Sequence, residues 1–279
     1  MQYLNSTNTL YDRYSEERYL YTETEPAVKG QVFVISEESD SLKSIQPLRG
    51  RTIRVPIIIY HSVRPYIPNE SLEQDTYDVT PELFEEELRY LKDNNYTTIS
   101  FTELHSFLAN GTPLPRRAVI LSFDDGWKNQ FVYAYPLLKK YSMTGTFFIF
   151  SGAIGSRSSF MSWDDVLVMH RGGMHIEGHS YTHPILTKTF GEQNIYRELT
   201  MSKRVIESHT GTPVTVFAYP FGMYDERIMH EVARAGYTLA RTTKNTAWHS
   251  EGTLHSTGGT LSSDSLSDFI TTVSGGTTH

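Results

Sequence analysis

The sequence predicts an α/β protein in which parallel strands, each followed by a helix, close into a barrel. From residue 56 onward, apolar runs of strand length alternate with amphipathic segments of helix length, a pattern typical of βαβ units on a parallel sheet. We find about seven of each, which favours a closed barrel over an open sheet. The 279 residues suffice for one such domain.

Residues 1–50 do not follow this pattern. They are polar, rich in Tyr and Glu, and only Gln31–Ser36 resembles a strand. We interpret residues 1–50 as a partly ordered N-terminal extension and residues 51–279 as the main domain. A flexible linker from a lost membrane anchor is the alternative interpretation of the extension.

The predicted strands are short apolar runs: 56–60, 96–100, 117–123, 144–150, 174–177, 214–218 and 237–241. The predicted helices have a helical apolar period and capping residues at their starts. Thr80 and Pro81 open the first, Thr102 caps the second, and Gly236 ends the sixth. The helices are 80–91, 102–108, 129–141, 162–170, 191–209, 225–235 and 263–273.

Composition limits the function classes. A net charge of -7 argues against a protein that binds nucleic acid through bulk charge. With no cysteine, the chain has no disulfide, cysteine nucleophile or thiolate metal site. No apolar run is long enough for a membrane-spanning helix. The start lacks the pattern of a secretory signal, and a sequence trimmed of its leader would look the same.

Two carboxylates end the strongest predicted strand, in the run Ser122-Phe-Asp-Asp-Gly126. Adjacent like charges are costly unless a cation or proton lies between them. Gly126 allows a sharp turn, so that Asp124 and Asp125 can point at different targets. A surface Asp-Asp-Gly turn is the alternative.

Two histidines, His179 and His183, follow another predicted strand. Four residues apart, they can converge on one metal ion, and neutral imidazole is a common zinc ligand. In a chain with 11 His the spacing also arises by chance. Together with one Asp of the pair, they would give three ligands and an open coordination position. The other Asp could take a proton from water, so the combination predicts a metal-assisted hydrolase.

Three motifs in this order resemble a known family: Phe123-Asp-Asp-Gly126, His179-Ser-Tyr-Thr-His-Pro184 and Ala218-Tyr-Pro-Phe-Gly222. They are similar to the first three motifs of the NodB-homology polysaccharide deacetylases, carbohydrate esterase family 4, and the resemblance covers about residues 55–275. Ile59-Tyr-His-Ser62 and Phe217-Ala-Tyr-Pro220 resemble the branch that deacetylates poly-N-acetylglucosamine and related bacterial envelope glycans.

The resemblance implies a distorted (β/α)7 barrel that removes N-acetyl groups from N-acetylglucosamine units of a polymer. Asp125, His179 and His183 would hold a divalent metal, usually zinc, with cobalt or nickel as alternatives. Asp124 would be the general base. A backbone N–H near Phe221 would help to stabilise the oxyanion, and a protonated His would donate to the leaving amine.

The chain departs from the family pattern at two points. Ala218 stands where many members have an Arg that pairs with the catalytic Asp. We predict that His61 orients Asp124 instead, with a packed core His as the alternative. The late general-acid His has no clear match. His255 is one candidate and His249 another, and His61 or a water would serve if neither does.

Four further residues are predicted to bind substrate. Tyr219, Pro220 and Phe221 would shape the acetyl pocket, and Trp163 would line the glycan groove or pack in the core. We therefore expect a monomeric, metal-dependent N-deacetylase of an extracellular or cell-envelope glycan: poly-N-acetylglucosamine, peptidoglycan or a chitin-like chain. The alternatives are a catalytically impaired glycan-binding module and a barrel hydrolase of a small amide.

Overall fold

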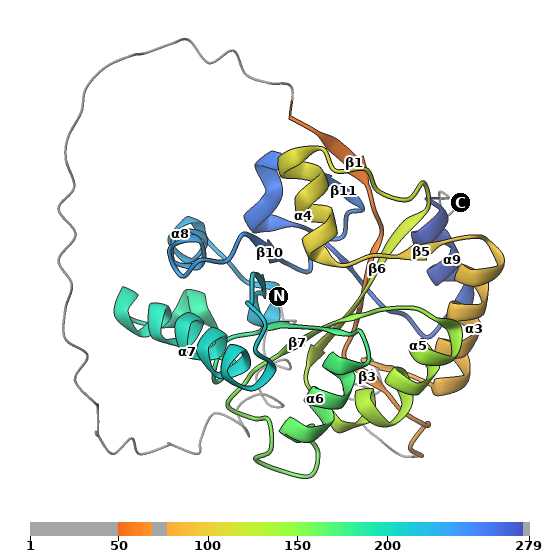
Figure 1. Ribbon diagram of the computed structural model, residues 1–279, viewed down its shortest axis with the longest axis horizontal. Helices are drawn as coiled ribbons and strands as arrows, with labels where there is room; N and C mark the ends of the chain where they lie inside the picture. Colours follow the sequence, from red (N-terminus) through yellow and green to blue (C-terminus); the bar gives the residue numbers. More distant parts are fainter. Residues whose placement is uncertain (1–49, 69–76, 276–279) are drawn as a thin grey trace, which may run out of the picture. The chain divides into compact units, whose positions relative to one another are not determined.

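The computed structural model describes residues 50–68 and 77–275 (Figure 1). The strand expected at 31–36 and residues 1–49 of the N-terminal extension lie outside this part. The central sheet has the strand order β10-β9-β8-β7-β6-β2-β12, with β5 paired to β6, and every pairing in it is parallel. Its strands are β2 (Ile57–Tyr60), β5 (Thr97–Thr98), β6 (Ala118–Asp125), β7 (Thr146–Ile149), β8 (His175–Gly178), β9 (Val216–Ala218), β10 (Leu239–Arg241) and β12 (Thr260–Leu261).

The segment 257–261 joins the two edges of the curled sheet. Thr257 forms a parallel bridge with Arg241 at the end of β10. Three residues later, β12 pairs with β2 at the opposite edge. The predicted parallel (β/α) barrel is therefore confirmed, and its closure depends on a strand of two residues that the apolar pattern did not reveal.

The helices follow the strands, as predicted. They are α3 (Pro81–Asp93), α4 (Phe101–Asn110), α5 (Tyr135–Tyr141), α6 (Trp163–Arg171), α7 (Glu192–Thr210), α8 (Glu226–Arg234) and α9 (Leu266–Ser274). The predicted cap at Thr102 is wrong. Ser100 caps α4, because its hydroxyl accepts from the Glu103 N–H while the Glu103 carboxylate accepts from Ser100. The helix expected from residue 129 begins as a π-helix, Gln130–Ala134.

Several short elements were not predicted. β1 (Thr52–Arg54) pairs in antiparallel fashion with β11 (Trp248–Ser250), and β3 (Ser62–Val63) pairs with β4 (Asp78–Val79). The remaining ones are 3-10 turns: 186–188, 220–222 and 251–256. A strand of two or three residues is too short to show a period, so these four strands are defined by pairing with their partners.

Alternate residues of each strand belong to different apolar clusters. On β2, Ile57 and Ile59 join an inner cluster that includes Phe148 of β7, whereas Ile58 and Tyr60 join a larger outer one. The outer cluster packs the sheet against α3 and α5–α9, and the inner one is completed by apolar residues of α4. The barrel interior is thus a packed core, and chemistry is confined to the strand ends.

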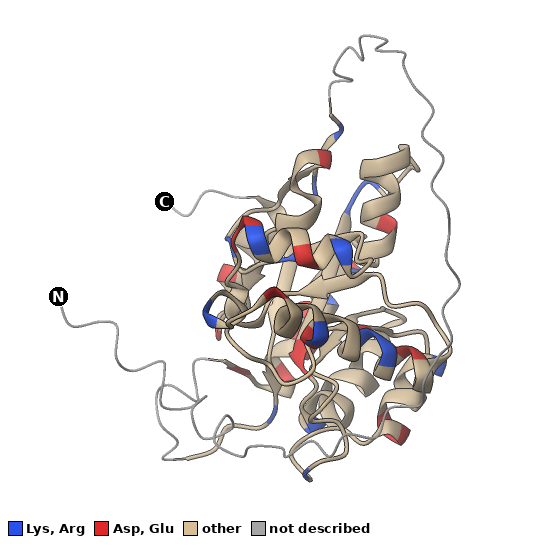
Figure 2. Cartoon of the chain, turned by 90° about the vertical axis from the view of Figure 1, so that its left-hand side faces the viewer, with Lys and Arg blue, Asp and Glu red and all other residues tan. Residues whose placement is uncertain are grey.

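Charge is spread over the outer surface. Figure 2 shows Lys and Arg interspersed with Asp and Glu on the helices seen from that side. Within the described ranges, no helix has both the length and the apolar character needed to cross a bilayer.

One carboxyl group lies inside the outer cluster. Glu87 of α3 is fully buried and accepts a 2.7 Å hydrogen bond from the Tyr60 hydroxyl. Its Oε1 has no partner among the described residues. Burial raises the pKa of Glu87 from 4.5 to about 8, and the Tyr60 hydrogen bond only partly opposes this rise. The folded protein therefore holds Glu87 protonated at neutral pH.

A raised carboxyl pKa makes folding less favourable as pH rises, because the unfolded chain loses the proton first. The contribution of Glu87 is fully present below pH 4.5 and is lost as pH rises to about 8. We expect Glu87→Gln to match the wild type near pH 4.5 and to exceed it at pH 9 by up to about 5 kcal/mol. Urea unfolding measures this, with exposed Glu86→Gln as control. Parallel pH profiles for wild type and Glu87→Gln would contradict it.

Candidate active site

The paired carboxylates lie at the carboxyl end of β6, and strand geometry separates their directions. Asp124 shares the inward face of β6 with Ile120 of the inner cluster, because the side-chain period is two. The chain then turns sharply: φ is 75° at Asp125 and 82° at Gly126. A Cβ at residue 126 would approach Ile154 Cδ1 to 2.8 Å. Because of this turn, the Asp125 side chain can point in a different direction from the Asp124 side chain.

Arg241 holds Asp124. Its Nη2 lies 2.5 Å from both carboxylate oxygens of Asp124, and the Arg241 side chain is completely buried. The guanidinium also lies over the ring of Phe148 at 5.2 Å. Arg241 thus makes the contact to Asp124 that the sequence predicts for His61. It lies at the end of β10, whereas the arginine of many family members corresponds to Ala218 of β9.

His61 also reaches the pair. Its Nε2 lies 3.8 Å from Asp124 Oδ2, and its side chain is 16% exposed. Gln130 of the π-helix is fully buried and joins the two strand ends. Its amide donates to the His61 carbonyl at 2.7 Å and to the Asp124 carbonyl at 2.5 Å. His61 is therefore held beside Asp124 from the solvent side.

Asp125, His179 and His183 form a second group. Their ligand atoms lie within 4.8 Å of one another. Asp125 Oδ1 is 3.5 Å from His179 Nε2 and 3.4 Å from His183 Nε2, and the two imidazole nitrogens are 3.1 Å apart. Trp127 Nε1–H donates to the other Asp125 oxygen at 3.0 Å. The structure therefore brings together all three predicted metal ligands.

The donor chemistry of this group fits a divalent cation. His179 Nδ1 lies 2.7 Å from the Ala218 carbonyl, which can only accept, so Nδ1 carries the proton and Nε2 presents a lone pair. Burial lowers the pKa of His183 to about 4, despite the opposing charge of Asp125. Burial raises the pKa of Asp125, but the His179 hydrogen bond and the nearby imidazoles outweigh it, and this pKa lies well below its usual range. One carboxylate and two imidazoles form a donor set that suits zinc.

The loop that carries the two histidines is fixed by Glu198 of α7. Its carboxylate accepts from the N–H of Tyr181 at 3.0 Å and from the N–H and hydroxyl of Thr182, each at 2.8 Å. Within the loop, the His183 N–H donates to Ser180 Oγ at 3.0 Å. Ser180 and His183 both have positive φ, at 65° and 60°. Such conformations persist only where surrounding contacts enforce them.

The other predicted site residues are placed as follows. Phe221 lies at the site, with its ring 4.8 Å from that of His183. Pro220 is buried beside it. Tyr219 is 1% exposed and its hydroxyl donates to the His255 carbonyl, so it points into the core rather than toward substrate.

Three predicted residues, His255, Trp163 and His249, are not brought to the carboxylates. The His255 ring nitrogen lies 2.9 Å from the Tyr237 carbonyl, which precedes β10. Arg241, the partner of Asp124, lies at the opposite end of that strand. The indole of Trp163 stacks on His209 near the end of α7 at 3.7 Å. The second acid candidate, His249, is buried against the Val55 carbonyl. His61 is the candidate acid that lies beside Asp124.

Sequence reasoning missed Arg241, Gln130 and Glu198. Arg241 ends a predicted strand, so the rule that barrel chemistry gathers at carboxyl strand ends could have identified it. Gln130 and Glu198 lie inside helical segments, where an isolated polar residue is ordinarily exposed. No sequence signal separates these two from other helical polar residues.

Comparisons with known proteins agree with this geometry. Residues 111–240 match the family model described as polysaccharide deacetylase. The poly-β-1,6-N-acetyl-D-glucosamine N-deacetylase of Staphylococcus aureus is 25% identical over 197 residues, which are 63% of this chain and 68% of the relative. The Bacillus subtilis protein YxkH is 27% identical over 216 residues, 77% of this chain and 73% of the relative.

Two solved structures extend the comparison. The Streptococcus pyogenes deacetylase PplD, solved in complex with acetate, is 26% identical with a TM-score of 0.73, covering 80% of this chain and 99% of PplD. IcaB from Ammonifex degensii is 22% identical with a TM-score of 0.70, covering 79% of this chain and 96% of IcaB, and shows the shared fold.

The buried Asp124–Arg241 ion pair leads to a prediction about the free energy of unfolding. Arg241→Gln leaves the Asp124 charge buried without its cation, and we expect the free energy of unfolding to fall by about 3–5 kcal/mol. Adding Asp124→Asn removes that charge, so the double variant should be more stable than Arg241→Gln alone. Urea unfolding of the full cycle measures this, with exposed Arg171→Gln as control. Additive effects of the two substitutions would show that the pair does not couple.

Glu198→Gln tests the support of the histidine loop. The amide offers one acceptor oxygen instead of two, so the loop should lose part of its anchoring. We expect zinc affinity to fall about tenfold or more, as for other groups that orient metal ligands. Competition with a chromophoric chelator measures it, with Glu192→Gln on the same helix as the matched control. Equal zinc affinities for the two variants would refute a positioning role for Glu198.

Proposed function

This chain is a polysaccharide deacetylase of the NodB-homology family, carbohydrate esterase family 4, and from that premise we propose its substrate and residue roles. We propose that it hydrolyses the N-acetyl groups of N-acetylglucosamine units in an extracellular or cell-envelope polysaccharide. The products are acetate and a free amine on the sugar. The observation that carries this proposal is the Asp125–His179–His183 group beside the Asp124–Arg241 pair.

Asp125, His179 and His183 would hold the cation, with zinc as the first candidate and cobalt or nickel as alternatives. When bound, a divalent cation supplies a Lewis acid that polarises the acetamide carbonyl and makes water more acidic. The His179 ring is fixed by the Ala218 carbonyl, and Asp125 is fixed by the Trp127 indole. These contacts aim the three donor atoms at one point.

Asp124 is the proposed general base. Arg241, a buried cation, contacts both carboxylate oxygens of Asp124 and so fixes the carboxylate in one orientation. His61, next to Asp124 and partly exposed, is the proposed donor of a proton to the leaving amine. Phe221, beside His183, would border the acetyl group, and an N–H near Phe221 would face the oxyanion.

The relatives support the choice of glycan. The Staphylococcus aureus relative is named for poly-β-1,6-N-acetyl-D-glucosamine, so a β-1,6-linked chain is our first candidate. Peptidoglycan and chitin-like β-1,4 chains are the alternatives. A catalytically impaired binding module is the less well supported alternative, because Arg241 supplies to Asp124 the cation that residue 218 lacks.

Acetate release tests the proposal. Protein loaded with zinc or cobalt is given N-acetylglucosamine oligomers with β-1,6 or β-1,4 linkage. We expect release that a chelator abolishes and that Asp124→Asn lowers at least about 100-fold, because the proton acceptor is lost. Asp164→Asn, an exposed carboxylate in the first turn of α6, is the matched control and should keep full activity.

Two outcomes would overturn the proposal. Asp124→Asn with undiminished release would remove Asp124 as the base. Failure to release acetate from either oligomer, by protein that holds one metal ion per chain, would favour the binding-module alternative.

A further inference from the structure

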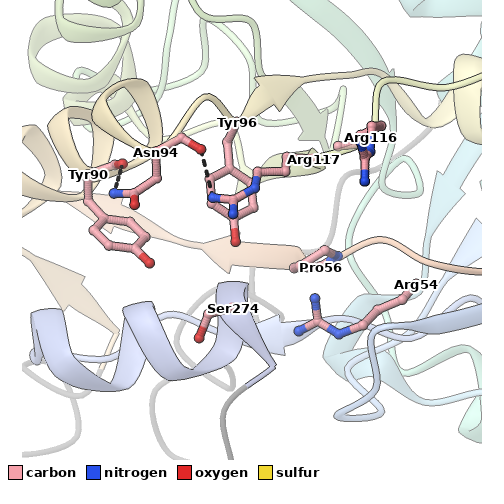
Figure 3. A pocket seen from close by; sticks show the side chains of 9 residues that line it. Arg54, Pro56, Tyr90, Asn94, Tyr96, Arg116, Arg117 and Ser274 are labelled. Atoms are coloured by element: carbon pink, nitrogen blue, oxygen red, sulfur yellow. Dashed lines mark hydrogen bonds between the residues drawn. The ribbon is translucent and has the colours of Figure 1, made fainter.

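A cavity of about 370 Å³ lies at the amino ends of the barrel strands, away from the deacetylase site. Figure 3 shows it between the end of α3, the start of β6, β1 and the end of α9. Its lining residues are Arg54, Pro56, Tyr90, Asn94, Tyr96, Arg116, Arg117, Ala118 and Ser274. We call it the arginine cavity. Arg117 precedes β6 and Asp125 ends it, so roughly 25 Å of strand separates the two regions.

The lining has one sign of charge. It includes three guanidinium groups, on Arg54, Arg116 and Arg117, and no carboxylate. No acidic side chain in the described part of the chain forms an ion pair with any of the three. The whole chain carries a net charge of -7, so bulk composition does not explain a concave, purely cationic surface. Like charges gathered in a concavity focus a positive potential and attract anions.

Two of the arginines are held in place by neutral partners. Arg54 donates to the Thr272 carbonyl at 2.8 Å and to the Val273 carbonyl at 3.0 Å. Arg117 donates to the Asn94 carbonyl at 2.8 Å and lies over the Tyr96 ring at 5.4 Å. Each guanidinium has five N–H donors, so these contacts orient the groups while leaving further donors available.

Arg116 extends the cationic surface. It is exposed, and it lines both the arginine cavity and an adjacent cavity of about 480 Å³. Arg117 is shared in the same way, and Asn95, Thr97 and Pro115 complete the second lining. The two hollows therefore meet at an arginine pair. Their combined volume is larger than a single inorganic ion requires, and it falls within the range of small-molecule binding sites.

We propose that the arginine cavity binds the phosphate group of a phosphate ester. Planar guanidinium forks match phosphate oxygens in bidentate geometry, and three cations can balance the two charges of a phosphate monoester or the charges of successive phosphodiester groups. The Tyr90 and Tyr96 rings and the neighbouring cavity offer room for the polyol or sugar that carries the phosphate. This site is independent of the deacetylase reaction.

Calorimetric titration of the zinc-loaded protein at low salt tests the proposal. The probes are inorganic phosphate and a short phosphodiester-linked glycerol phosphate oligomer. We expect saturable binding that weakens with added NaCl, falls about tenfold in Arg116→Gln, and falls further in Arg116→Glu. Arg171→Gln, which removes an exposed arginine from α6, should bind as the wild type does. If inorganic phosphate binds more tightly than the oligomer, the ligand is a small phosphate ester. If the oligomer binds more tightly, the ligand is a polymer.

Acetate release separates this inference from the proposed function. Arg116→Gln should deacetylate normally, because Arg116 lies at the opposite end of β6 from Asp124. The inference is overturned if neither probe binds the wild type, or if both bind Arg116→Gln as tightly as Arg171→Gln. Either result leaves the deacetylase assignment untouched.

Discussion

The ion pair between Asp124 and Arg241 is the contact on which the active face depends. β6 and β10 are four places apart in the sheet, or about 19 Å if the sheet were flat. Their side chains nevertheless meet at 2.5 Å, so the pair can form only in a curled sheet whose inward faces converge. A buried pair adds little net stability, but leaving either charge alone is costly. The pair therefore couples barrel closure to the orientation of the Asp124 carboxylate.

Around this pair, the strands determine the direction of each site side chain, and the strained turns that follow them determine its position. Four of the six non-glycine residues with positive φ in the described part of the chain lie at the site: Asp125, Ser180, His183 and Phe221. Their cost is offset by contacts from outside the turns, such as Glu198 on the histidine loop. Strain gathered where a ligand would be held is the expected signature of a functional site.

The sequence predicted the barrel and both site motifs because strong signals carry them: alternating elements, an Asp pair and a His pair at strand ends. It did not reveal which residue would orient Asp124. That assignment depends on strand order, which places β10 across from β6, and no local pattern encodes strand order. His255 was misplaced for the same reason: the 3-10 turn that carries it packs near the start of β10, not its end. Elements of two residues, such as β12, are likewise defined only by their partners.

We propose two separate roles at this site: metal binding by Asp125, His179 and His183, and proton transfer by Asp124. Metal content per chain, measured after equilibrium dialysis against zinc, tests that division most directly. We expect one zinc ion per chain in the wild type and in Asp124→Asn, and a large loss of zinc in His183→Ala. Retention of zinc by His183→Ala, or its loss from Asp124→Asn, would contradict it.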